Sequence, residues 1–499
     1  MTAGRAEKTV VSALGRRFAA RLVGEGIQSI YHFGLNVALI RLFSPYDYGS
    51  FSIIFMTGVM AILFSDALFA IPASVYVPGR RPAAAKVLEV TLGSVALALS
   101  IAIAGVAALV MSIWLGSFLT GSLAGGFVGL WALRNYTRAV ALTRSDVGGA
   151  IRATLSDLSY SVLGAVLLVV TGFALRLPLT LTSVFACLCA ASAVGVLLAS
   201  LGGARRIRVS FRPRRLRRYA ALWPEIAWSL VGVGTAVVQG QSQMFLVACL
   251  AGPAAFAPIA AGFVLVSPIR IVSGSVLSVL RPELSRRRSA VAARSTSRML
   301  AFSGLCLIAF CGIYGLCLFA GWPFLRSELY ARSFGGEPMG LIVAIAWLTA
   351  TTYTGYQPIR ALAQSRSRFR EIALASMVGG SAGFLIVLAL LLLSDPPTST
   401  FGVVAGEAVT LVLLWRLHQR SLAEEMAIHR STMSARTSVD TPPQRAGQGA
   451  SLACRNRDGR SEGQAASAVP AAGPHRVAGG ERLMRRANDD HGRCHNERV

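Results

Sequence analysis

The chain alternates between long apolar stretches and short polar segments. An α-helix needs about 20 apolar residues to cross a bilayer, and charged residues, proline and glycine separate such stretches here. We therefore predict an all-α polytopic membrane protein with about twelve transmembrane helices. They cover residues 22–40, 51–77, 88–116, 122–143, 154–173, 179–201, 222–250, 255–280, 299–321, 340–358, 372–394 and 399–415.

Basic residues are distributed unevenly between the two sides of these stretches. If the N-terminus is cytoplasmic, the inner segments hold 30 arginines and lysines and the outer loops hold 4. Positively charged loops stay in the cytoplasm, so we expect both termini to be cytoplasmic.

The longest inner loop divides the chain into two halves of six predicted helices each. We predict two pseudo-symmetric lobes, residues 1–202 and 222–429, joined by a basic cytoplasmic linker at 203–221. A weak internal repeat aligns Pro45 with Pro253, and repeated halves are typical of secondary transporters. Residues 430–499 are rich in Arg, Gly, Ala, Ser and Pro, which predicts a disordered cytoplasmic tail.

Composition excludes several classes of protein. Hydrophobic residues make up 54% of the chain and charged residues 14%, which is too little charge for a soluble protein. The net charge of +26 comes from short clusters between apolar runs, so we expect no nucleic-acid partner. Six of the eight cysteines lie within apolar stretches, and we expect neither a disulfide framework nor a cofactor. A metal site in the tail at His491, Cys494 and His495 is a weak alternative to our expectation of no metal.

Two predicted helices bear a polar stripe. Glu25, Gln28, His32 and Asn36 are spaced by three, four and four residues in the first helix, and Thr235, Gln239 and Gln243 repeat the pattern in the seventh. Lipid would not tolerate these stripes, so each lines either a lumen or a contact between helices. We favour the lumen.

Three arginines lie inside the predicted spans. Arg134 and Arg138 are one helical turn apart in the fourth, and Arg270 follows Pro268 in the eighth. They predict a cationic cavity for phosphate or an acidic sugar, and the alternatives are snorkelling to the interface or pairing with a carboxylate. We regard Asp66 and Glu407 as the other acids deep within spans and, with Glu25, as candidates for ion coupling or for neutralising an arginine.

Four short motifs follow one another in a familiar order. They are Arg41-Leu-Phe-Ser-Pro-Tyr-Asp-Tyr-Gly-Ser-Phe51, Arg134-Asn-Tyr-Thr-Arg-Ala-Val-Ala-Leu-Thr-Arg144, Leu280-Arg-Pro-Glu-Leu-Ser-Arg286 and Glu328-Leu-Tyr-Ala-Arg-Ser-Phe-Gly-Gly336. With them the chain, over about residues 10–420, resembles the polysaccharide-biosynthesis flippases of the multidrug/oligosaccharidyl-lipid/polysaccharide (MOP) exporter superfamily. It departs from them in the seventh helix, where Gln243 stands in place of an acid common in that family.

The resemblance implies a flippase of the cell inner (plasma) membrane that is not an enzyme. It would move a polyprenyl-diphosphate-linked oligosaccharide across the membrane by alternating access, for surface or exopolysaccharide biosynthesis. Implied partners are this lipid-linked substrate, membrane lipids, and polysaccharide polymerase and export machinery. Thr351, Thr352, Tyr353 and Tyr356 are candidates for contacting sugar hydroxyls.

Two other functions remain as alternatives. One is a MOP-superfamily exporter of small cationic drugs, against which the three arginines argue. The other is a membrane polysaccharide polymerase, for which the longest outer loop, about residues 323–339, is too short.

Overall fold

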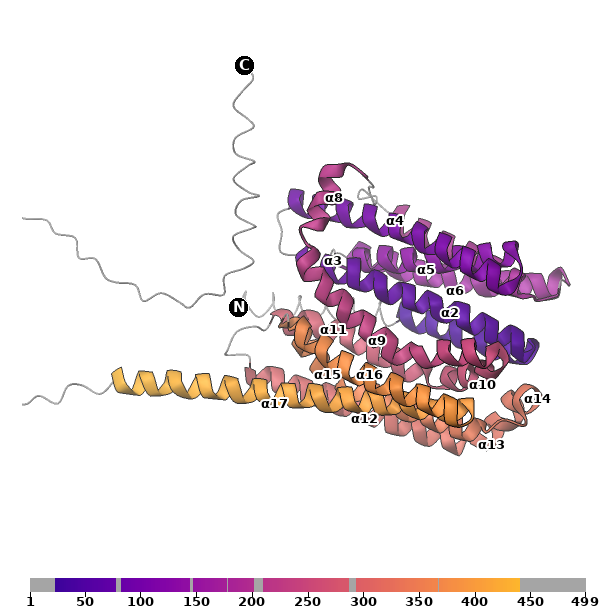
Figure 1. Cartoon of the computed structure of the whole chain (residues 1–499). Helices are drawn as coiled ribbons and strands as arrows, with labels where there is room; N and C mark the ends of the chain where they lie inside the picture. Colours follow the sequence, from indigo (N-terminus) through magenta and orange to yellow (C-terminus); the bar gives the residue numbers. More distant parts are fainter. Residues whose placement is uncertain are drawn as a thin grey trace, which may run out of the picture. The chain divides into compact units, whose positions relative to one another are not determined.

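The computed structural model describes residues 23–77, 82–143, 147–176, 178–201, 210–286, 293–366 and 368–439, and these are helical almost throughout (Figure 1). Within these ranges there is no β-strand. The chain divides into two compact units, Met1–Ser431 and Thr432–Val499. The candidate tail site at His491, Cys494 and His495 lies outside the described residues.

The N-terminal helix set, as we call it, begins with a helix over residues 23–42. In this set α2 and α4 pack on α5, and α5 and α6 pack on α7 (Figure 1). Its other elements are α2 (Pro45–Ser65), the π-helical turn η1 (Asp66–Ala70), α3 (Ile71–Tyr76), α4 (Pro82–Leu115), α5 (Phe118–Thr143), α6 (Val147–Val169), η2 (Val170–Ala174) and α7 (Leu181–Leu201).

A short helix, α8 (Pro213–Ala220), precedes the C-terminal helix set, which we define as α9 to α17 up to Ser431. In this set α9 packs on α16, and α15 packs on α11 and α12. The elements are α9 (Trp223–Leu250), α10 (Gly252–Leu265), α11 (Ser267–Arg286), α12 (Ala293–Ala320), α13 (Trp322–Leu325), η4 (Arg326–Tyr330), α14 (Ala331–Phe334), α15 (Met339–Ser365), α16 (Phe369–Leu393), η5 (Pro396–Ser399) and α17 (Thr400–Val439).

Each of the twelve predicted spans contains a described helix or series of helices. By length and composition, 7 helices of the described chain could cross a membrane alone, and up to 9 spans result if each of two bent helix pairs counts as one. The first helix, α5 and α9 are not among them, and these three bear most of the predicted substrate-binding residues. The prediction of an all-α multi-pass membrane protein is confirmed, and the lobe boundaries stay a prediction.

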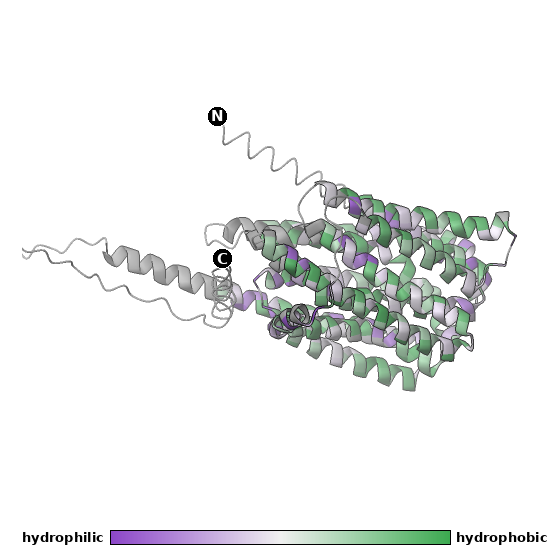
Figure 2. Ribbon diagram, turned by 90° about the horizontal axis from the view of Figure 1, so that it is seen from above, coloured by the Kyte–Doolittle hydropathy of each residue, from purple (hydrophilic) through white to green (hydrophobic). Residues whose placement is uncertain are grey.

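The outer faces of the bundle are apolar, as lipid requires (Figure 2). The windows of α4 and α12 that could span a membrane are only 22% buried. Their exposed side chains are large and hydrophobic, including Ile101, Leu109 and Ile113 on α4 and Phe302, Leu305 and Leu316 on α12.

Small residues bring helices into close contact. A Cβ atom on Gly125 of α5 would overlap the backbone of Ala104 and Ala108 on α4. Gly121 and Gly129, one turn away on either side, meet α4 in the same way. Close approach of this kind replaces hydrophobic burial as the source of helix association in lipid.

The eighth predicted span is a bent pair. Its first helix, α10, packs on α2, α9 and α15, and its second helix, α11, packs on α15 and α12. The two are bent by 52° where Val266 separates them. Pro268, at the second position of α11, has no N–H to continue the hydrogen-bond series of α10, which explains the break.

The second predicted helix, 51–77, begins earlier in the structure. α2 starts at Pro45 and includes Asp47, Tyr48 and Gly49, and Ser44 Oγ accepts a hydrogen bond from the Asp47 amide at 3.1 Å. Tyr48 is buried.

At the ends predicted to face the cytoplasm, the helices extend further than hydropathy indicates. α6 begins at Val147, before 154, and α15 ends at Ser365, beyond 358. α17 continues to Val439, into the predicted tail, and residues 440–499 lie outside the described ranges.

Candidate functional site

The carboxylate of Asp157, on α6, lies between two arginines of α5. Arg134 Nη1 is 3.2 Å from Asp157 Oδ1, and Arg138 Nη1 is 3.3 Å from Asp157 Oδ2. The side chains of Arg134 and Asp157 are 2% and 4% exposed. Arg134 and Arg138 therefore adopt the alternative of pairing with a carboxylate. Their role in substrate binding stays a prediction.

Hydrogen bonds extend this ion-pair cluster to α2. Arg138 Nη2 donates to Asn135 Oδ1 at 3.0 Å, and Asn135 Nδ2 donates to Asp66 Oδ1 at 2.8 Å. Asp66 is the first residue of the π-helical turn η1. Such turns are frequent at functional sites. The candidate coupling residue Asp66 is thus connected to both arginines.

Glu25, whose charge acts on Arg138 of this cluster, contacts the C-terminal helix set. Its Oε2 atom accepts a 2.6 Å hydrogen bond from the Ser275 hydroxyl of α11. Next to it, a Cβ on Gly24 would lie 3.0 Å from Asp157 Oδ2, so the first helix also approaches the shared carboxylate. The network therefore ends at a contact between the two sets.

His32 lies in an aromatic cage beside the arginines. Its Nε2 is 3.0 Å from the Tyr160 hydroxyl oxygen, and its ring is 5.1 Å from Phe55 and 5.4 Å from Trp131 between centroids. The Arg134 guanidinium lies 4.0 Å from the centroid of the Tyr160 ring, a cation–π contact.

Asn36 and Gln243, of the two polar stripes, have partners inside their own helix set. Asn36 accepts a hydrogen bond from the buried Tyr48 hydroxyl at 3.3 Å. Gln243 Nε2 donates to Thr400 Oγ1 at 3.0 Å. Both correspond to the alternative of a contact between helices. Gln28 has a buried Oε1 without a hydrogen bond to the described residues, and the side chain of Gln239 lies outside the described part.

A second charged cluster lies in the C-terminal helix set. The Tyr356 hydroxyl of α15 donates a 2.6 Å hydrogen bond to Glu407 Oε2 of α17. The Arg270 guanidinium of α11 lies 5.7 Å from the Phe263 ring and 5.8 Å from the Tyr353 ring. Arg360, one turn after Tyr356, is 8% exposed.

Three further contacts join the sets at the end predicted to face outward. Arg41 Nη2 lies 3.6 Å from Glu328 Oε2 and donates to the Glu328 carbonyl at 2.8 Å. Ser333 Oγ donates to the Ile40 carbonyl at 3.0 Å. A Cβ on Gly49 would overlap the Pro253 carbonyl, so α2 and α10 touch through their backbones.

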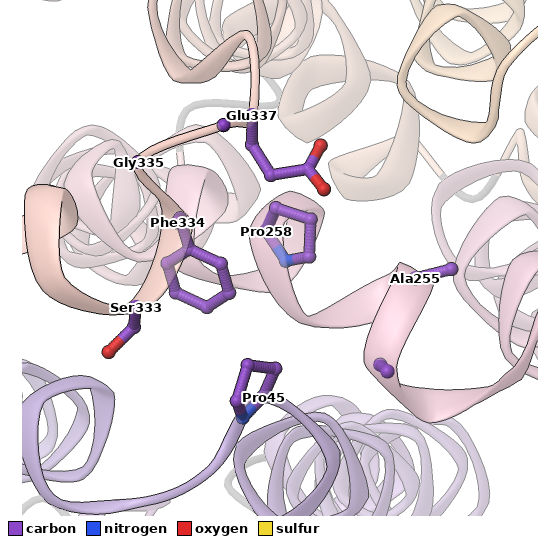
Figure 3. Close-up of a pocket in the computed structure, with 9 residues that line it drawn as sticks. Pro45, Ala255, Pro258, Ser333, Phe334, Gly335 and Glu337 are labelled. Carbon is purple, nitrogen blue, oxygen red and sulfur yellow. The ribbon is translucent and has the colours of Figure 1, made fainter.

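A pocket opens beside these contacts. It has a volume of about 360 Å³. Figure 3 shows Pro45 of α2, Pro258 of α10 and Phe334 of α14 around it, with the Glu337 side chain extending above. The pocket thus lies where the two helix sets meet.

Sequence reasoning missed two charged residues. Asp157 was overlooked beside Asp66 and Glu407, although it lies in the predicted fifth span. Arg360 was assigned to an inner loop and is a buried residue of α15. A census of every acid within the predicted spans would have found Asp157. For Arg360 the sequence gives no such signal. Pro358, two residues before it, indicates the end of a helix, but α15 continues through this proline.

A scan with protein-family models finds no match, and neither does a search of curated proteins. Solved structures match over most of the chain. A MATE transporter in its straight conformation has a TM-score of 0.59 at 13% identity, covering 83% of this chain and 96% of that one. A MOP superfamily transporter from Pyrococcus furiosus has a TM-score of 0.57 at 12% identity, with the same coverage.

An inward-facing multidrug resistance MATE family transporter has a TM-score of 0.55 at 12% identity, covering 80% of this chain and 96% of that one. At these identities the likeness concerns the fold. The chain therefore has the fold of MATE family transporters of the MOP superfamily.

Proposed function

We propose that this chain exports small organic molecules across the cell inner membrane by alternating access, with both termini cytoplasmic. The observation that supports it most is the fold. The chain matches a multidrug resistance MATE family transporter equally well in its inward-facing and outward-facing conformations, with a TM-score of 0.55 for each. A fold solved in both states is one that alternates between them.

The buried charges support transport over a purely structural role. Replacing a buried ion pair by apolar residues of similar volume is often neutral or stabilising, so stability alone does not explain why such a pair is present. Charged residues within membrane spans therefore mark substrate or ion pathways. Here the charge of Glu25 acts on Arg138 of the Asp157 cluster, and the Ser275 hydroxyl joins Glu25 to the C-terminal helix set.

The inter-set contacts fit alternating access. At the outer end they include the Arg41–Glu328 ion pair and the Ser333 hydrogen bond to Ile40. At the inner end the Glu25–Ser275 hydrogen bond joins the sets. Opening to either side would break the contacts at that end and keep the others.

The flippase function is our second candidate. It rests on the four ordered motifs, beginning with Arg41 to Phe51. A diphosphate would need unpaired guanidinium groups. Because Asp157 pairs with both Arg134 and Arg138, this part of the chain offers fewer of them than the sequence indicates. We therefore place small-molecule export first.

Transport assays can test the proposal. Purified protein in liposomes should drive uptake or efflux of members of a panel of cationic, zwitterionic and anionic dyes when a proton or sodium gradient is imposed. Glu25→Gln should reduce the rate strongly, because it removes a charge at the inner contact. Glu337→Gln is the matched control, since Glu337 is exposed at the outer pocket.

If no dye moves under any gradient, small-molecule export is wrong. Lipid-linked oligosaccharides stranded on the inner leaflet of a deletion strain would then favour the flippase function.

A further inference from the structure

One face of α15 bears four side chains that can form hydrogen bonds. Tyr353, Tyr356, Gln357 and Arg360 are spaced at i, i+3, i+4 and i+7, so they lie along one side of the helix. Contacts define what this side meets. Tyr353 lies below the Arg270 guanidinium of α11, and Tyr356 donates to Glu407 of α17. This face of α15 therefore lies toward α11 and α17.

Three hydrogen-bond donors of α11 and α15 have no acceptor. The Nε atoms of Arg270 and Arg360 and the Nε2 atom of Gln357 are buried and make no hydrogen bond within the described chain. Gln357 and Arg360 are 2% and 8% exposed. Native proteins rarely leave buried donors unpaired, because each loses its bonds to water and gains none in return. Buried donors of this kind are available to an anionic ligand, and both arginines act on the same Glu407 carboxylate.

The carboxylate of Glu407 does not accept a hydrogen bond from any of these three donors. Glu407 is 4% exposed, and its Oε2 atom is bound by the Tyr356 hydroxyl. Among the described residues, it has no ion pair with Arg270 or Arg360, although the charges of both arginines act on it. The Asp157 cluster differs in this respect, because its carboxylate contacts both arginines directly.

The C-terminal cluster, formed by Arg270, Arg360 and Glu407, has a net charge that indicates which ligand would bind. Two guanidinium groups and one carboxylate leave a net charge of +1, which one monoanion neutralises. A planar carboxylate suits the donor geometry of a guanidinium group. The Phe263 and Tyr353 rings beside Arg270 add an apolar surface that an aromatic or alkyl group can cover.

We infer that Arg270, Gln357 and Arg360 form a binding site for an organic monocarboxylate. As the site of an exported molecule it rests on the proposed function, and as a binding site it stands without it. The exported molecules would then include anions or zwitterions with a carboxylate, which binds between α11 and α15.

Benzoate is a suitable probe, and benzamide is its uncharged counterpart of the same shape. Binding is measured by isothermal titration calorimetry on the full chain in nanodiscs, with empty nanodiscs subtracted. Benzoate should bind at least about tenfold more tightly than benzamide. Arg360→Gln should weaken benzoate binding about tenfold to a hundredfold, since it removes a charged donor. The control Arg326→Gln removes an exposed arginine and should change nothing.

A second variant keeps the test informative if Arg360→Gln does not fold. Gln357→Glu places a carboxylate among the same donors, so it should occupy the site and abolish benzoate binding while preserving or raising the unfolding temperature of the ligand-free protein. Equal binding of benzoate and benzamide, or wild-type benzoate binding by Gln357→Glu, would overturn the inference.

The two proposals can fail separately. Benzoate binding without transport of any dye would contradict export and leave the site intact. Transport of cationic dyes without benzoate binding would refute the site alone.

Discussion

The Ser275 hydroxyl donates a 2.6 Å hydrogen bond to the Glu25 carboxylate and so joins α11 to the first helix. A hydrogen bond to a charged acceptor contributes about 1.5–3 kcal/mol, more than an exposed ion pair. Because this bond links the two helix sets at their inner end, it should influence which end opens.

Removing that bond should favour opening at the inner end. We expect Ser275→Ala to increase the population with a widened inner end about tenfold or more. Spin labels at Val23 and Trp228, both exposed, would report the distance by pulsed electron resonance. Ser303→Ala is the control, because the Ser303 hydroxyl bonds to Leu300 of its own helix. Unchanged distances in Ser275→Ala would contradict this role.

At the outer end we expect a smaller effect. The Arg41–Glu328 pair is 51% and 57% exposed, so its loss should cost no more than about 1 kcal/mol. The double variant Arg41→Ala/Ser333→Ala should shift the outer population by about fivefold, measured between labels at the exposed Leu42 and Phe324.

Arg332→Ala is the matched control for the outer variant, since Arg332 is an exposed arginine next to Ser333 on α14. An equal shift in that control would show that net charge, and not the contact, sets the distance.

Asp157 should be essential for stability. Asp157→Asn leaves two guanidinium groups close together without their shared anion, and breaking a buried pair costs about 3–5 kcal/mol. We expect a clearly lower unfolding temperature in detergent, partly restored by Arg134→Met in the same chain. The Arg368–Glu371 pair, which is 33% and 40% exposed, is the control, and Glu371→Gln should have a smaller effect. Wild-type stability of Asp157→Asn would refute the ion-pair assignment.

Two glycines offer a test of helix packing. Gly125→Val should destabilise the protein by about 2 kcal/mol or more, because the side chain would overlap the backbone of α4. Gly105→Val, on α4, has open space around its Cβ and should be tolerated. Thermal unfolding of both variants decides this, and equal loss of stability would contradict the packing.

The charge of the C-terminal cluster gives a further prediction. Glu407→Gln still accepts the Tyr356 hydrogen bond and raises the net charge of the cluster to +2. Benzoate should bind about tenfold more tightly, and phthalate, a dianion, should gain more. Calorimetry on the Glu407→Gln variant tests this, and weaker benzoate binding than in the wild type would contradict the charge argument.

The fold could be predicted from sequence because the bilayer restricts the choices. Backbone groups in lipid must be satisfied within each segment, so apolar length alone indicates helices. The pairing of charges could not be predicted in the same way. Asp157 and Arg134 lie on different helices, and only packing shows that they touch.

Hydropathy also misplaces residues near the ends of spans. Arg360 is charged and follows the predicted span 340–358, so the sequence predicts that it lies in a loop. In the structure α15 continues beyond residue 358 to Ser365, about two further turns, and buries the arginine. Polar stripes are ambiguous for the same reason, since water and a polar neighbour such as Thr400 satisfy Gln243 equally well.

The break at Val266 divides one predicted membrane span into two helices with different neighbours. α10 meets α2 of the N-terminal helix set through Gly49 and Pro253 and also packs on α9 and α15, whereas α11 packs on α12 and α15. If the helix sets tilt relative to each other, as the proposed alternating access requires, the chain can bend at Val266, because Pro268 interrupts the helical hydrogen bonds there. A crosslink or a stapled helix across Val266 should therefore slow the proposed transport without touching any charged group.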